Sequence, residues 1–160
     1  MRWSRFAVLV LVVTVLQAGL LENFSFKPDL LLILLVFFAV CSSVSEAVIV
    51  SFTIGFAADV IGPAMGPQMI SFGLFGTSLA YLHRVIAIRK MPYQALAIFV
   101  IGLSAGGLAH FLAFLKNHTP ASNIYSIVFW TSLSSAVVGP FLFLPSAWWM
   151  RMKPRRLRRR

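Results

Sequence analysis

Long apolar runs, separated by only a few short polar segments, decide what this chain can fold into. Charged residues make up 11% of the sequence, whereas an average soluble domain has roughly 25%. So few charged side chains cannot cover a water-soluble globule. Runs of this length predict an all-α integral membrane protein. The five runs are Phe6–Leu21, Leu30–Ile61, Met69–Leu82, Ala95–Leu115 and Ile124–Met150.

The second run is too long for a single membrane crossing. About 20 helical residues cross a bilayer, whereas Leu30–Ile61 would extend roughly 48 Å as one helix. Its only polar cluster is Cys41–Glu46, where a serine can cap a new helix with Glu46 in the first turn. We therefore predict that the run divides at this cluster, which gives six transmembrane helices in total.

The basic residues favour six crossings with both termini in the cytoplasm. This count places Arg2, Arg5, the 84–90 segment and the basic C-terminal tail on one side, as expected for cytoplasmic loops rich in Lys and Arg. Five crossings would translocate one terminus, and four would place the 84–90 segment outside. We therefore predict a six-span membrane domain at residues 1–150 and a basic cytoplasmic tail at residues 151–160.

The net charge of +10 indicates contact with lipid, and no nucleic-acid partner is expected. Most of this charge follows the last apolar run directly, a position in which basic residues contact anionic lipid headgroups. The candidate lipid contacts are Arg151, Lys153, Arg155 and Arg156.

The last apolar run contains Pro140 and Pro145. Proline inside a helix removes a backbone hydrogen bond and kinks or ends the helix. We therefore predict a kink near Gly139–Pro140, with Trp148 and Trp149 at the cytoplasmic interface.

Small residues recur on one face of several predicted spans, and such faces let membrane helices approach closely. Ser51, Gly55, Asp59 and Gly62 are spaced so that they share a helix face. Asp59 then has two interpretations that the sequence leaves open. It is either a buried polar group that contacts a partner or a carboxylate that caps the next segment.

Two similar stripes follow later in the chain, and we predict that they serve helix packing. One comprises Gly73, Gly76 and Ala80, and the other Gly102, Gly106 and His110. His110 is expected to be a hydrogen-bonded packing residue, because no second metal-binding side chain stands at ligand spacing.

Motifs of catalysis are missing from the sequence: it contains neither HExxH nor a Gly-rich phosphate loop. We therefore expect a protein that is not an enzyme and that holds no cofactor and no metal.

Three short motifs, taken in order and spacing, resemble the bacterial rod shape-determining protein MreD family. Lys27-Pro28-Asp29-Leu30-Leu31 follows the first span, Gly55-Phe-Ala-Ala-Asp59 closes the third, and Gly62-Pro-Ala-Met-Gly66-Pro begins the next loop. The resemblance covers roughly Phe6 to Tyr93. Two features depart from the family pattern, the Ser-rich segment Cys41–Ser45 and the long Arg-rich tail, so the resemblance implies nothing about the tail. The matching positions are candidate packing or partner-docking residues: Pro28, Asp29, Gly55, Asp59, Gly62 and Gly66.

The resemblance implies a fold similar to the six-helix substrate-binding subunits of energy-coupling-factor transporters. It also implies a non-enzymatic scaffold of the cell-elongation complex in the bacterial cytoplasmic (inner) membrane. Its partners would be MreC-like and MreB-like proteins, which organise lateral peptidoglycan synthesis.

Two other functions stay open. A substrate-binding subunit of a small-molecule, vitamin-type transporter would need a polar cavity of roughly 300–1,000 Å³. A lipid-handling protein would need a groove for an acyl chain or a lipid-linked precursor.

Overall fold

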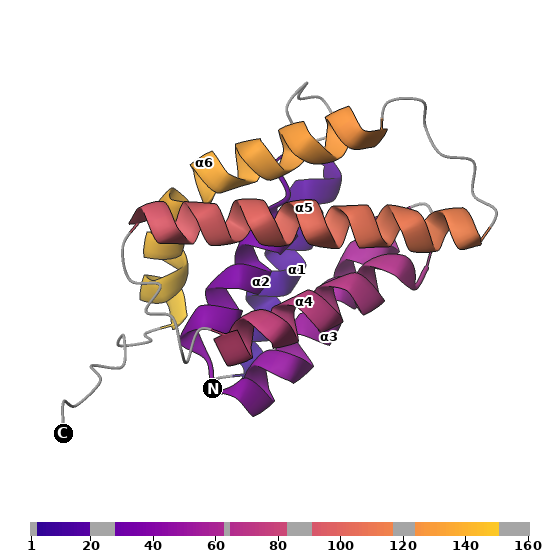
Figure 1. Ribbon diagram of the computed structural model, residues 1–160. Helices are drawn as coiled ribbons and strands as arrows, with labels where there is room; N and C mark the ends of the chain where they lie inside the picture. Colours follow the sequence, from indigo (N-terminus) through magenta and orange to yellow (C-terminus); the bar gives the residue numbers. More distant parts are fainter. Residues whose placement is uncertain (1–2, 20–27, 63–64, 83–90, 117–123, 151–160) are drawn as a thin grey trace.

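The computed structural model describes residues 3–19, 28–62, 65–82, 91–116 and 124–150, and these residues form six α-helices (Figure 1). The predicted all-α class is therefore confirmed. The helices are α1 (Trp3–Gly19), α2 (Leu30–Cys41), α3 (Val44–Ile61), α4 (Pro67–Leu82), α5 (Met91–Leu115) and α6 (Ile124–Met150).

Within the described residues, three helices are long and apolar enough to cross a membrane. The qualifying segments lie in α3, α5 and α6, at Val44–Ile61, Tyr93–Leu115 and Tyr125–Phe143. The other helices are shorter, and α2 has only 12 residues. A helix of that length extends about 18 Å, less than the ≈ 30 Å thickness of a bilayer core. The count of six crossings therefore stays a prediction.

The second apolar run divides where its polar cluster predicts. Helix α2 ends at Cys41 and α3 begins at Val44, with Ser43 as the N-cap residue. The backbone N–H and the hydroxyl of Ser43 both donate to Glu46 Oε2, at 3.3 and 2.9 Å. This exchange between the cap and the third helical residue stabilises the start of α3.

Helix α2 lies at the centre of the molecule. Residues 31–39 are all buried, and α2 contacts each of the other five helices. A helix that is apolar on every side can be buried on every side. Edge-to-face ring contacts, with centroids 5.1 Å apart for Phe6–Phe38 and 5.4 Å apart for Phe37–Phe143, connect α2 to α1 and α6.

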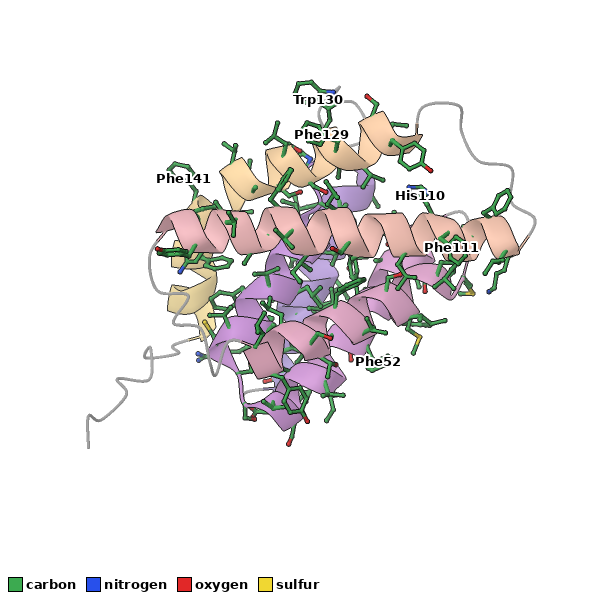
Figure 2. All side chains as sticks on the ribbon, in the orientation of Figure 1. Phe52, His110, Phe111, Phe129, Trp130 and Phe141 are labelled. Carbon is green, nitrogen blue, oxygen red and sulfur yellow. The ribbon has the colours of Figure 1, made fainter. Side chains whose placement is uncertain are left out.

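The outer faces of the bundle are apolar. On α6, Trp130 and Phe141 point away from the other helices (Figure 2) and are 50% and 71% exposed. Phe129 contacts Phe99 of α5 and is still 44% exposed. Exposed apolar side chains on this scale are typical of a surface that contacts lipid or a partner.

Small residues set the distance between α3 and α4. A Cβ atom on Gly55 would lie 2.7 Å from Met69 Cα, and one on Gly76 would clash with the Ser51 side chain. The two helices therefore pack with their backbones in close contact. In α5, the Gly102 and Gly106 positions face Ser132 and Val128 of α6 in the same way.

Helix α6 changes direction sharply before its last turns, in the part of the chain that carries Pro140 and Pro145 (Figure 1). This bend agrees with the kink predicted from the prolines. The side chains of Trp148 and Trp149 lie outside the described residues. So do Arg2, the 83–90 segment and the tail with Arg151, Lys153, Arg155 and Arg156.

Candidate functional site

Asp59 caps the N-terminus of α4 from the end of α3. Its carboxylate accepts hydrogen bonds from the backbone N–H groups of Gly66 (2.9 Å), Gln68 (3.0 Å) and Met69 (2.9 Å). Pro67 has no N–H group, so Asp59 accepts every N–H that residues 66–69 can donate. A carboxylate at a helix N-terminus is favoured by the helix dipole. Asp59 is 3% exposed, and its three hydrogen bonds to the start of α4 are those of a capping residue.

The turn between α3 and α4 is shaped to reach this carboxylate. Gly66 has a φ of 109°, in the left-handed region that glycine adopts without steric cost, and it directs its N–H toward Asp59. Gly62 ends α3, with its N–H 3.0 Å from Ala58 O. From the end of α5, the Lys116 ammonium group donates to Met65 O at 2.7 Å. The turn is thereby fastened to a third helix.

A second carboxylate, Asp29, caps α2 in a similar way. Its Oδ1 atom accepts from Leu32 N at 3.0 Å and from Gln17 Nε2 at 3.1 Å. Gln17 Oε1 in turn accepts from Leu31 N at 3.1 Å, and Ser135 Oγ accepts from Asp29 N at 2.7 Å. One polar cluster therefore joins α1, the start of α2, and α6.

Asp29 lies just before α2, where the surrounding helices separate it from bulk water. This removal from water raises the pKa of its carboxyl group, since the charged form loses hydration. Hydrogen bonds from the Leu32 N–H and from Gln17 oppose that effect and lower the pKa.

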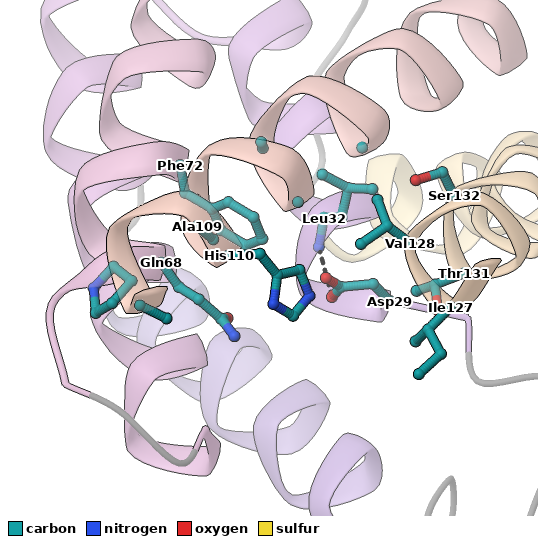
Figure 3. Close-up of a pocket in the computed structure, with 15 residues that line it drawn as sticks. Asp29, Leu32, Gln68, Phe72, Ala109, His110, Ile127, Val128, Thr131 and Ser132 are labelled. Carbon is teal, nitrogen blue, oxygen red and sulfur yellow. Dashed lines mark hydrogen bonds between the residues drawn. The ribbon is translucent and has the colours of Figure 1, made fainter. Parts of the chain in front are cut away.

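The two capped helix starts border the same pocket, a half-open cavity of about 230 Å³ (Figure 3). Its polar lining comes from four elements: Asp29 before α2, Gln68 on α4, His110 on α5, and Thr131 and Ser132 on α6. Figure 3 shows His110 between Gln68 and Asp29. The apolar walls include Leu32, Phe72 and a row of small α5 residues, Gly102, Ala105, Gly106, Ala109 and Ala113.

His110 differs from its expected packing role. Its side chain is exposed and lines the pocket, and no hydrogen bond joins it to another described residue. Among the described residues, no group of three His, Cys, Asp or Glu side chains is placed to hold a metal ion.

The structure brings the candidate residues into two neighbouring groups. Gly55, Asp59, Gly62 and Gly66 belong to the α3–α4 corner, whereas Pro28 and Asp29 precede α2. Gln68 of the first group and Asp29 of the second share the pocket. Sequence reasoning missed Gln17, Gln68, Thr131, Ser132 and Ser135. The available signal was modest: Gln17 is the one amide in its apolar run, and the serines cluster in an otherwise apolar segment.

The fold defines an all-helical protein of the membrane-spanning class, with three described helices able to cross a bilayer. The family model described as rod shape-determining protein MreD matches residues 1–153. The chain therefore belongs to the MreD family, and the resemblance in its motifs is confirmed. This family consists of membrane proteins that act in rod shape determination and is associated with the MreB/MreC shape system. No curated protein and no solved structure matches the chain.

Proposed function

We propose that the protein is a non-enzymatic scaffold subunit of the bacterial cell-elongation complex. It would hold MreC-like and MreB-like proteins together at the bacterial cytoplasmic membrane, where they direct lateral peptidoglycan synthesis. The family match supplies the role in rod shape. The finer proposal is carried by one observation: one end of the bundle is fixed by two carboxylate caps around a pocket. Helix starts that are held by such hydrogen bonds present a defined surface to a partner protein.

The proposal includes six crossings with both termini in the cytoplasm, in a fold similar to the energy-coupling-factor binding subunits. The starts of α2, α4 and α6 and the end of α5 border the pocket. In a bundle whose helices alternate in direction, all of these ends lie on one side. The pocket would then open away from the cytoplasm, and the basic tail at 151–160 would contact anionic lipid on the cytoplasmic side.

Within this scaffold, the six motif residues would shape the docking surface. Asp59, Gly62 and Gly66 hold the start of α4 in place, and Gly55 sets its distance from α3. Asp29 holds the start of α2 and also lies on the pocket surface. A partner segment would therefore contact the turn and the helix starts that these residues hold in place.

The proposal is tested by depleting the protein in a rod-shaped bacterium that encodes it. We expect cells to widen and round, and a plasmid-borne wild-type copy to restore the rods. An MreC-like protein should co-purify with the tagged wild-type chain but not with an unrelated multi-pass protein expressed at the same level. Depleted cells that keep their shape and width would exclude the scaffold role.

A substrate-binding subunit of a transporter is the second candidate, favoured by the polar lining of the pocket. The cavity of about 230 Å³ is smaller than the 300–1,000 Å³ typical of small-molecule sites. The interior beneath it is filled by Leu and Phe side chains of α2. The scaffold therefore accounts better for the structure.

A further inference from the structure

The pocket contains polar groups whose hydrogen-bonding capacity is not used by the rest of the described chain. Asp29 Oδ1 accepts hydrogen bonds from Leu32 N and Gln17 Nε2, and the Asp29 side chain also lines the cavity. The side chains of Gln68, Thr131 and Ser132 make no hydrogen bond with described residues, and all three line the cavity. Ser132 is buried, whereas Gln68 and Thr131 are half-buried. These side chains are therefore available to form hydrogen bonds with a polar group that enters the cavity.

The charged residues of the pocket indicate which chemical group of a ligand it would bind. Among the described residues that line it, Asp29 is the one acidic residue, and none is Lys or Arg. The described Lys116 ammonium group is engaged with Met65 O in the α3–α4 turn. His110 is the other ionisable side chain among the described lining residues. A carboxylate oxygen in these surroundings favours a ligand with a cationic hydrogen-bond donor.

The other polar groups of the pocket indicate that the ligand also has a hydrogen-bond acceptor close to its cationic group. Gln68, Thr131, Ser132 and His110 each carry an N–H or O–H donor, and they come from α4, α5 and α6 around the same cavity (Figure 3). Donors from several helices suit a phosphodiester, whose oxygens accept several hydrogen bonds. The ligand would thus be zwitterionic, with an ammonium and a phosphate group a few bonds apart.

The size of the cavity and the apolar residues around it narrow the choice among zwitterionic ligands. A cavity of about 230 Å³ admits a headgroup and excludes a large solute. The walls beside the polar groups are apolar and smooth, formed by Phe72, Val128 and the small residues of α5. The bundle itself presents apolar outer faces to its surroundings. A molecule with a small zwitterionic head and an apolar body matches these features.

We propose that this pocket binds the headgroup of an aminophospholipid of the phosphatidylethanolamine type. The ammonium group contacts the Asp29 carboxylate, and the phosphate accepts hydrogen bonds from Gln68, His110, Thr131 and Ser132. A cation at Asp29 also offsets the loss of hydration that this carboxylate suffers. The site goes beyond the scaffold role and does not depend on it.

The test uses the full chain in nanodiscs that contain equal amounts of phosphatidylethanolamine and phosphatidylglycerol. Native mass spectrometry counts the lipids that stay bound after the nanodisc is removed. We expect the wild type to retain phosphatidylethanolamine preferentially, and Asp29→Asn to reduce this preference about tenfold, the scale of one charged hydrogen bond. Asparagine is an equally good N-cap residue, so α2 stays capped. Glu46→Gln changes a carboxylate at the start of α3, far from the pocket lining, and should have no effect.

A second pair of variants tests the cavity without touching its charge. Ala109→Leu places additional side-chain volume in the pocket and should lower phosphatidylethanolamine retention. Ala7→Leu adds the same volume at an exposed position of α1 and should leave retention unchanged. Circular dichroism of each variant confirms that the helices are intact.

Three results would overturn the proposal. Wild-type protein that retains both lipids equally would show that the pocket has no preference for an ammonium group. Soluble glycerophosphoethanolamine that binds in phosphatidylglycerol nanodiscs, while no phosphatidylethanolamine is retained, would make the ligand a soluble molecule. An Ala109→Leu variant that loses a co-purified protein but keeps the lipid would make the occupant a protein segment.

Discussion

At the scale of single residues, the three acidic side chains that the structure describes each lie at or near a helix start. Asp29, Glu46 and Asp59 each bond to backbone N–H groups at or near a helix start. Each helix N-terminus leaves N–H groups without an intrahelical acceptor, and water is scarce inside a membrane protein. A side-chain acceptor at these points therefore stabilises the helix starts.

Asp59 gives the sharpest prediction at this scale. Asp59→Ala would leave the N–H groups of Gly66, Gln68 and Met69 without their acceptor, which should destabilise the fold by about 2–3 kcal/mol. Asp59→Asn keeps one acceptor oxygen and should cost clearly less. Thermal unfolding in detergent, followed by circular dichroism, measures both. The same midpoint for the wild type and Asp59→Ala would contradict the capping role.

We also expect Asp59→Ala to insert into the membrane but to bind an MreC-like partner more weakly.

At the scale of helices, the contact between α3 and α4 depends on the absence of a side chain. Gly55→Ala would place a methyl group 2.7 Å from Met69 Cα, and backbone cannot move aside as a side chain can. We expect a loss of about 1–3 kcal/mol from the forced separation of the two helices. Gly107→Ala is the matched control, because nothing lies within 4 Å of its added Cβ. That variant should be neutral or stabilised by up to ~1 kcal/mol, since alanine favours helix.

The two glycine variants are compared by the midpoint of thermal unfolding under identical detergent conditions. Equal effects at both positions would mean that helix propensity alone matters. A larger loss at Gly55 would identify close backbone packing as the cause.

Sequence patterns predicted the helices well and the site only in part. The length of the run from Leu30 to Ile61 and its serine-rich interruption were enough to predict two helices. Hydropathy could not show that α2 is short and central, because lipid-facing and protein-facing apolar residues look alike. The pocket escaped prediction for another reason. Asp29, Gln68, His110 and Ser132 come from four elements, and only the packing of α5 against α4 and α6 brings them together.

At the scale of the whole molecule, the orientation in the membrane is the central expectation. A fluorescent protein that matures only in the cytoplasm should be bright when fused to the C-terminus. Alkaline phosphatase, which is active only outside the cytoplasm, should be active when fused after Lys116. The reverse fusions serve as controls. A bright fluorescent fusion at Lys116 would contradict six crossings and would place the pocket on the cytoplasmic side.

The central position of α2 has a consequence for the order of events during synthesis. Helix α2 leaves the ribosome second, yet the helices that enclose it include α4, α5 and α6, which are made later. Ser135, which accepts the Asp29 N–H, is added when more than four fifths of the chain exists. Until then the start of α2 must find temporary partners in lipid, translocation machinery or water. Completion of α6 is thus the step that closes the molecule, and a nascent chain stopped short of it would expose its own core.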